Sequence, residues 1–151
     1  MHLENSIKAN GELTIVVRNE KTGEIKQTLH AKNLVVTVGK TYLASRAVGV
    51  TSSVMSHMAI GTGTGTPVAG DTALGTEAGR VTLASGSNSA NAITYTATFP
   101  AGTGTGAITE AAVFNSATPG AANSILCRTT FPVVNKAAGD SIAVTWVVTI
   151  S

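Results

Sequence analysis

The sequence predicts a mainly β protein, specifically an antiparallel β-sandwich with one short helix. Its apolar residues are mostly valine, isoleucine and alanine, threonine is frequent and only 4% of residues are aromatic. β-Branched side chains favour strands, and short apolar–polar alternations recur between segments rich in Gly, Pro and Ser. A jelly-roll and an immunoglobulin-like connection of the strands both fit, because one sequence does not fix strand pairing.

The length of 151 residues is sufficient for one domain with its own core. We expect a single domain over 1–151, made of a charged N-terminal hairpin at 1–32 and a helix plus sandwich core at 33–151. The hairpin is predicted from alternating strands at 12–18 and 24–30, joined by a polar turn at 19–23. One helix is predicted over 36–47, where apolar residues recur at three-to-four spacing, and Gly49 ends it.

The remaining chain reads as strands separated by small-residue linkers. Strands are predicted at 55–61, 80–84, 92–99, 107–115, 124–131 and 141–150. Linkers are predicted at 61–70, 85–91, 100–106, 116–123 and 132–140. Residues 71–78 fit one short helical turn, with Asp71 as its N-cap.

Charge is concentrated near the N-terminus, since eleven of the eighteen Lys, Arg, Asp and Glu residues precede Ala47. A free globular domain usually has about a quarter of its residues charged, so the neutral remainder indicates a subunit packed against copies of itself or a larger lattice. The charged residues after Ala47 are Asp71, Glu77, Arg80, Glu110, Arg128, Lys136 and Asp140. We expect Asp71 to cap its turn, and Glu77 or Glu110 to pair with Arg80 or Arg128.

Several functional classes are not favoured. The net charge of +2, without a basic run, argues against a nucleic-acid partner. No apolar run approaches 18 residues and the N-terminus lacks a signal-peptide pattern, so we expect no membrane association and synthesis in the cytoplasm. Gly39-Lys40-Thr41 resembles the end of a phosphate-binding loop, but Leu34 stands where that loop requires glycine.

Histidine and cysteine do not form a recognisable site. His2, His30 and His57 are far apart and lack metal-ligand spacing. Cys127, the only cysteine, is expected to be a buried thiol, and no local pattern supports its pairing with His57. We therefore expect no catalytic, cofactor or metal site and no enzymatic activity.

The most distinctive local pattern is an alternation of glycine and threonine that occurs twice. It has neither a full dinucleotide fingerprint nor a long helix after it, so nucleotide binding is not favoured. Small residues of this kind allow close contacts between backbones, and we take them as candidate assembly contacts. They are Gly61, Thr62, Gly63, Thr64, Gly65, Thr66, Gly102, Thr103 and Gly104.

Segments spread over residues 33–151 carry a resemblance. They are HMAIGTG at 57–63, PVAGDTALGTE at 67–77, ITEAAVFN at 108–115, RTTFP at 128–132, NKAAGDS at 135–141 and VTWVVTIS at 144–151. In this order and spacing they resemble small virion structural proteins of tailed bacteriophages and prophages.

The resemblance implies a non-enzymatic virion component made in the bacterial host. One placement is a capsid decoration or cement protein that binds the major capsid protein lattice. The alternative is a tail or tail-fibre associated adaptor or receptor-binding module, in which Tyr95, Phe114 or Trp146 would contact a glycan if exposed. Trp146 is more consistent with core packing, between Thr145 and Val147. A closed homo-oligomer, a dimer or trimer, is expected in either placement.

Overall fold

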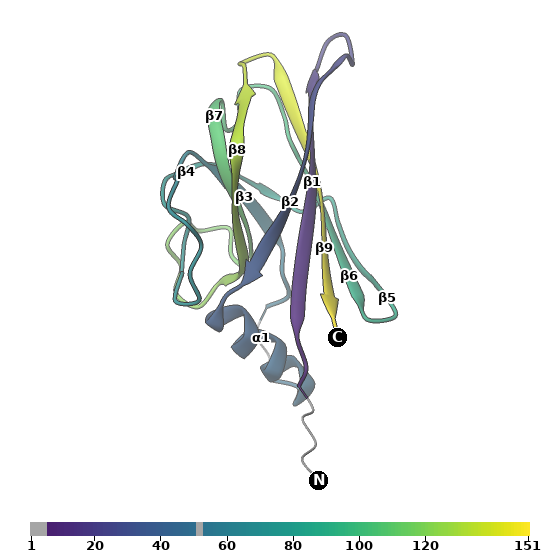
Figure 1. Cartoon of the computed structure of the whole chain (residues 1–151), viewed down its shortest axis with the longest axis vertical. Helices are drawn as coiled ribbons and strands as arrows, with labels where there is room; N and C mark the ends of the chain where they lie inside the picture. The colour runs from purple at the N-terminus through teal and green to yellow at the C-terminus, as the bar shows by residue number, and fades with distance from the viewer. Residues whose placement is uncertain (1–5, 51–52) are drawn as a thin grey trace.

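The computed structural model describes residues 6–50 and 53–151, and it is mainly β, with 54% strand and one helix. Nine antiparallel strands form one sheet that curls into a half-barrel (Figure 1). The expectation of a mainly β, antiparallel fold with one short helix is confirmed. The elements are β1 Ala9–Asn19, β2 Ile25–Val35, α1 Thr37–Ala47, β3 His57–Gly61, β4 Glu77–Thr82, β5 Ser85–Ser89, β6 Ala92–Phe99, β7 Gly106–Phe114, β8 Ile125–Lys136 and β9 Asp140–Ile150.

The strand order is β4-β3-β7-β8-β2-β1-β9-β6-β5. β2 joins the two halves, because it pairs with β1 along most of its length and with β8 only at Leu34 and Val35. The two edge strands, β4 and β5, are consecutive in the chain and are separated by only Leu83 and Ala84. The curl therefore brings one end of each edge strand close to the other.

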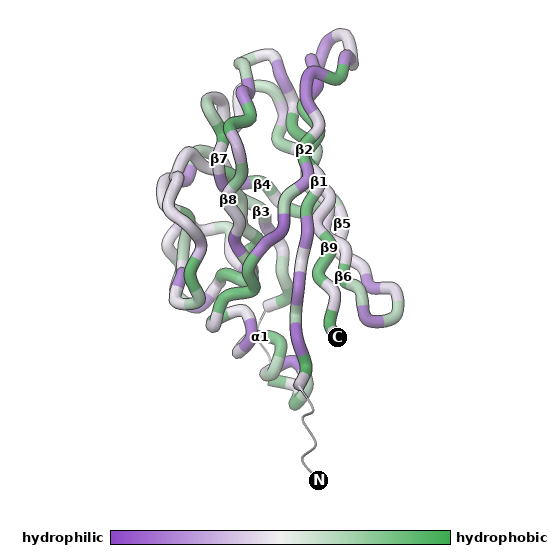
Figure 2. Tube along the Cα trace, viewed as in Figure 1, coloured by the Kyte–Doolittle hydropathy of each residue, from purple (hydrophilic) through white to green (hydrophobic). Residues whose placement is uncertain are grey.

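The charged hairpin lies in the middle of this sheet, as strands β1 and β2. Leu13, Ile15 and Val17 alternate into the core and are at most 1% exposed, as their period-two spacing predicts. The turn is stabilised by Asn19, whose Oδ1 accepts the backbone N–H groups of Lys21 and Thr22, both at 3.0 Å. Figure 2 shows that this turn is mostly hydrophilic and projects from one end of the molecule.

The helix begins one residue later than expected and ends at Ala47, as predicted. Gly39 is buried where α1 crosses β8, and a Cβ there would lie 2.0 Å from the carbonyl oxygen of Leu126. Gly49 has a φ of +71°, the left-handed conformation that commonly ends a helix and that glycine adopts most readily.

The expected helical turn at 71–78 is wrong. Residues 71–76 are irregular, and β4 starts at Glu77 rather than at Arg80. Asp71 caps no helix, because its carboxylate accepts the N–H of Val68 at 2.9 Å and pairs with Arg128 at 2.8 Å. Tertiary contacts therefore determine the conformation of this segment.

Two expected linkers are strands instead. Residues 85–89, Ser-Gly-Ser-Asn-Ser, form the exposed edge strand β5, although they include no β-branched or aromatic side chain. Residues 132–136 continue β8 beyond Pro132. Proline lacks the N–H that a ladder needs, and it lies where the β7–β8 register is irregular, between the pairs Ile108–Val134 and Glu110–Thr130. The loops at 100–106 and 116–123 are close to their predicted positions.

The core has two parts. The larger part fills the curl of the sheet and includes Trp146, which is fully buried, as expected. The smaller part contains Leu74, Phe114 and Ile125, so the connection between β3 and β4 contributes a core residue of its own. Residues 108–114 of β7 are consequently buried on both faces.

Candidate assembly surface and its buried ion pairs

The first glycine–threonine segment begins at the end of β3 and continues into the loop on the left of Figure 1. Gly61 is buried and Gly63 half-buried, whereas Thr62, Thr64, Gly65 and Thr66 are exposed. The threonine side chains are therefore the part of this segment that is available to a partner.

The second glycine–threonine segment packs against the strands from which the first one emerges. A Cβ at Gly104 would lie 2.6 Å from Cδ1 of Ile60, and one at Gly79 would lie 2.9 Å from the backbone nitrogen of Gly104. Gly104 is buried, Thr103 is half-buried and Gly102 is exposed. The fold thus brings the two segments together around Ile60, but only some of the nine candidate contacts lie on the surface.

Glu110 on β7 holds the first segment in place. Its side chain is completely buried, and its carboxylate accepts the backbone N–H groups of Gly63 at 2.9 Å, Gly75 at 2.9 Å and Thr76 at 2.8 Å. A Cβ on Gly63 would come within 2.5 Å of this carboxylate, so glycine is required for the close approach. Both ends of the 62–76 connection are therefore fixed to one buried side chain.

Arg128 on β8 completes this cluster. Its Nε and Nη2 donate hydrogen bonds to Oε2 of Glu110 at 3.2 and 2.9 Å. Its Nη1 donates to the carboxylate of Asp71 at 2.8 Å, and Nη2 donates a further bond to the carbonyl oxygen of Gly65 at 3.0 Å. One buried guanidinium thus bridges two carboxylates and the loop backbone. Such charge-assisted bonds are short and directional, and they order the loop.

The pKa of Glu110 reflects this environment. Burial alone would raise it, but the hydrogen bonds from Thr76, Gly75, Arg128 and Gly63 together hold the pKa below its ordinary value. Both carboxylate oxygens are occupied by donors, so the group is not arranged to take a proton from a substrate. Its geometry is that of a structural anion.

A second cluster fixes the loop at 100–102. The buried ammonium group of Lys136 donates to the carbonyl oxygens of Pro100 at 2.9 Å and Asp140 at 2.6 Å. The side chain of Asp140 pairs with Lys26 at 2.7 Å. The bond from Lys26 is the main reason that the pKa of Asp140 is lowered. These contacts connect the N-terminal hairpin to the end of the sheet that carries Gly102.

All seven charged side chains that follow Ala47 are bonded within the chain. Besides the two clusters, Glu77 and Arg80 pair at 2.7 Å, and the Arg80 guanidinium lies 3.9 Å from the centre of the Phe114 ring. The expected pairings of Glu77 with Arg80 and of Glu110 with Arg128 are confirmed. The outer surface of this part of the chain is consequently formed mainly by Thr, Ser, Gly and Ala.

The charged residues within the predicted strands are themselves a signal for these clusters. Glu110 and Arg128 are each the only charged residue in the strands predicted at 107–115 and 124–131, and a charged residue is rarely buried without a partner. That pattern predicts a buried pair. It does not predict the contacts with Gly63, Gly75 and Thr76, which depend on the course of the loop.

The other candidate residues lie apart from these clusters. The ring nitrogens of His57 contact Ser56 at 2.8 Å and Thr82 at 3.5 Å, and the buried Cys127 has a raised pKa because burial disfavours its thiolate. Phe114 and Trp146 are buried and Tyr95 is 7% exposed, so the two former rings are not available to a glycan. His2 lies outside the described residues.

Within residues 6–50 and 53–151, no group of three or more His, Cys, Asp and Glu side chains is arranged to hold a metal ion. The helix found in the same ranges is too short and too polar to cross a membrane.

Comparison with known proteins returns no matching family model, no similar curated sequence and no similar solved structure.

Proposed function

We propose that this protein is a non-enzymatic structural component of a tailed-bacteriophage virion, a capsid decoration or cement protein that binds the major capsid protein lattice. The observation that carries the proposal is the internal pairing of every charged side chain after Ala47, which leaves a neutral surface. Burial of a neutral surface against a partner costs little electrostatic free energy, because no exposed ion has to lose its hydration. The order and spacing of the segments between 33 and 151 provide the phage context.

The contact region of this proposal is the exposed part of the 62–66 loop. Thr62, Thr64 and Thr66 project from a backbone that Glu110 and Arg128 hold in place. An ordered loop loses less conformational entropy on binding than a mobile one, so it favours a repeated contact. Many modest contacts of this kind, each burying apolar and hydroxyl-bearing surface, stabilise a shell collectively.

As finer features of the same proposal, the two halves of the curled sheet act as the two layers of a β-sandwich, with β2 crossing between them. The protein assembles as a closed dimer or trimer, the usual symmetry of soluble oligomers. It is made in the cytoplasm of the host bacterium and is recovered with the virion, without a nucleic-acid or membrane partner.

Placement in the virion is tested by gold-labelled antibodies on purified particles. Label over the head surface supports the decoration role. Label restricted to the tail would replace it with the tail or tail-fibre adaptor, and unlabelled particles would reject both.

The contact loop is tested by adding purified protein to heads assembled without it and measuring the bound fraction. We expect Thr64→Glu to weaken binding at least tenfold, because it places an unpaired charge in the contact. Thr28→Glu, at an exposed position of the charged hairpin, is the matched control and is expected to bind normally. Equal binding of both variants would exclude the 62–66 loop as the contact.

A further inference from the structure

The two edges of the sheet differ in how well they are protected. The edge strand β4 is irregular, because its pairing with β3 skips Ala78. The loop that follows β7 is also tied to β4, since Nη1 of Arg80 donates to the carbonyl oxygens of Ser116 and Thr118 at 2.7 and 3.5 Å. Bulges and covering loops are common means by which proteins stop an edge strand from pairing with another chain.

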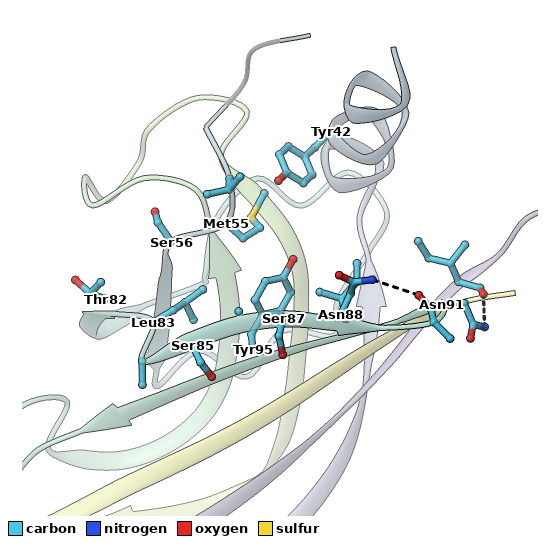
Figure 3. Close-up of a pocket in the computed structure, with 16 residues that line it drawn as sticks. Tyr42, Met55, Ser56, Thr82, Leu83, Ser85, Ser87, Asn88, Asn91 and Tyr95 are labelled. Carbon is cyan, nitrogen blue, oxygen red and sulfur yellow. Dashed lines mark hydrogen bonds between the residues drawn. The ribbon is translucent and has the colours of Figure 1, made fainter. Parts of the chain in front are cut away.

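The other edge strand, β5, has no such protection. All five of its residues are exposed and pair with β6 in unbroken register, and no strand among the described residues pairs with its outer side. Residues 85–91 include no charged residue and no proline, which usually discourage pairing at an edge. Figure 3 shows Ser85, Ser87 and Asn88 along the border of an open cleft of about 840 Å³, so there is room beside the strand.

The hydrogen bonds of β6 show which of its residues bond to β5. The N–H of Ile150 donates to the carbonyl oxygen of Asn91 at 2.9 Å, and bonded residues alternate along a strand, so the odd-numbered residues of β6 bond to β9. The even-numbered residues therefore bond to β5. The bond from the N–H of Ala84 to the carbonyl oxygen of Thr96, at 2.7 Å, agrees with this assignment.

The free backbone groups of β5 follow from the same alternation. The even-numbered residues of β6 stand opposite Ser85, Ser87 and Ser89, so the backbone groups of these serines are used within the sheet. The N–H and C=O groups of Gly86 and Asn88 point the other way, away from β6. Each molecule thus presents two donors and two acceptors on this edge, from residues two positions apart.

This set of groups is complementary to itself. When two copies of β5 run antiparallel about a two-fold axis at Ser87, Gly86 of each copy stands opposite Asn88 of the other. Each of these pairs exchanges two hydrogen bonds, so the register forms four and uses every free group of both edges. On one face each glycine leaves space for the asparagine opposite it, and on the other face only serines meet.

The difference between the edges favours a closed pair over a chain of copies. Pairing of β5 with β4 of another copy would repeat without end, but Arg80 and the loop at 116–118 protect β4. Pairing of β5 with itself closes after two copies. A charged residue near the axis would face its own copy there and repel it, and β5 has no charged residue.

We propose that β5 pairs with β5 of a second copy of this chain and joins the two sheets into one across a two-fold axis at Ser87. The proposal deepens the closed oligomer of the proposed function and rests on it in that respect alone, because no phage partner is involved. The contact is a short strand with four backbone bonds, so the dimer forms in proportion to protein concentration.

Cysteine cross-linking of the full-length chain tests the register. Ser87 and its copy form a non-hydrogen-bonded pair at the axis, in which the Cα atoms are about 4.5 Å apart, a separation that a disulfide spans. We expect Ser87→Cys to give a covalent dimer with diamide, which oxidises the two thiols to a disulfide. Cys127, the only native cysteine, does not interfere because it is fully buried.

Ser89→Cys is the matched control on the same face of β5. In the proposed register Ser89 stands opposite Ser85 of the second copy, so the two copies of Ser89 are about 13 Å apart along the strand. We expect no cross-linking of this variant above the background of random collisions. A mixture of Ser85→Cys and Ser89→Cys, with a tag on one of them, is expected to give the mixed covalent dimer.

Sedimentation equilibrium over a wide range of protein concentrations tests the dimer itself. We expect the wild type to show a monomer–dimer equilibrium. Asn88→Pro removes one outward N–H and keeps the bonds to β6, so it is expected to weaken dimerisation at least tenfold without changing the circular dichroism spectrum. Asn88→Ser keeps that N–H and is expected to dimerise as the wild type does.

Four results would overturn the proposal. They are a monomer at every concentration, a trimer, a dimer that a folded Asn88→Pro variant does not weaken, and equal cross-linking of Ser87→Cys and Ser89→Cys. The cross-linking comparison decides the question even where the proline variant does not fold. Antibody labelling of particles decides the virion placement separately, so failure of the dimer and failure of the proposed function are distinguishable.

Discussion

Replacement of Glu110 by glutamine tests whether one buried carboxylate organises the 62–76 connection. The substitution keeps the size of the side chain but removes its charge and turns one of two acceptor oxygens into a donor. In the structure those oxygens accept five hydrogen bonds, three from backbone N–H groups and two from Arg128. Breaking a buried ion pair by removing one partner costs about 3–5 kcal/mol, and we expect the free energy of unfolding to fall by that amount.

The assay is urea denaturation followed by the fluorescence of Trp146, the only tryptophan and a fully buried one. The slope of the free energy of unfolding against urea concentration should be the same in the variant and the wild type, because both expose the same surface on unfolding. Glu12→Gln, at an exposed position on β1, is the control and is expected to stay within about 0.5 kcal/mol of the wild type. A loss of less than about 1 kcal/mol for Glu110→Gln would refute the reasoning.

A double variant distinguishes this cluster from a simple ion pair. Replacing both members of a buried pair by apolar residues of similar size is often neutral. Here Glu110→Leu combined with Arg128→Met should not restore stability, because the N–H groups of Gly63, Gly75 and Thr76 would lose their acceptor. Wild-type stability in the double variant would show that these backbone contacts contribute little.

The remaining predictions use the same denaturation assay. Trp146→Ala should lower the free energy of unfolding by about 3–5 kcal/mol, because it empties the centre of the core, and unchanged stability would mean that the ring is exposed. Gly39→Ala should destabilise by at least about 2 kcal/mol, because its Cβ would clash with the backbone of Leu126, whereas Gly65→Ala, in open space, should have little effect. The free energy of unfolding should also fall as the pH drops below 4.5, the ordinary pKa of a glutamate. The pKa of Glu110 is lower in the folded protein than in the unfolded chain. The stability that Glu110 contributes is therefore complete above its pKa in the unfolded chain, and it is lost as the pH falls through its pKa in the folded protein. The Glu110→Gln variant should lack that part of the acid dependence, and identical pH profiles would assign it to other groups.

The sequence was a good guide where a strand has one apolar face. Leu13, Ile15 and Val17 in β1 alternate with residues that are more exposed, and period two alone predicts that strand. The helix was also predictable, because its apolar spacing and Gly49 are local features. In these elements the local pattern and the tertiary environment favour the same conformation.

Prediction failed where distant contacts decide the local conformation. Asp71 binds Arg128, 57 residues further along the chain, and Gly75 and Thr76 bind Glu110, 35 and 34 residues away. Those contacts replace the helical turn that the sequence of 71–78 allows. β5 was missed for a related reason, because its small polar residues have no strand preference of their own and the strand exists through backbone pairing with β6.

The same distant contacts bear on the proposal that the glycine-rich 62–66 loop makes the assembly contact. Glycine gives the 62–66 segment a large entropy in the unfolded chain, which would normally make a poor contact surface. The hydrogen bonds to the buried carboxylate of Glu110 offset the entropic cost of ordering this loop when the chain folds, before any partner binds. Glycine is nevertheless required, since a Cβ at Gly61 or Gly63 would collide with that carboxylate. We therefore add the Glu110→Gln protein to heads assembled without the wild-type protein and measure the bound fraction. We expect the variant to bind more weakly than the wild type by a larger factor than the decrease in its folded fraction explains. Binding that simply follows the folded fraction would show that the loop needs no prior order.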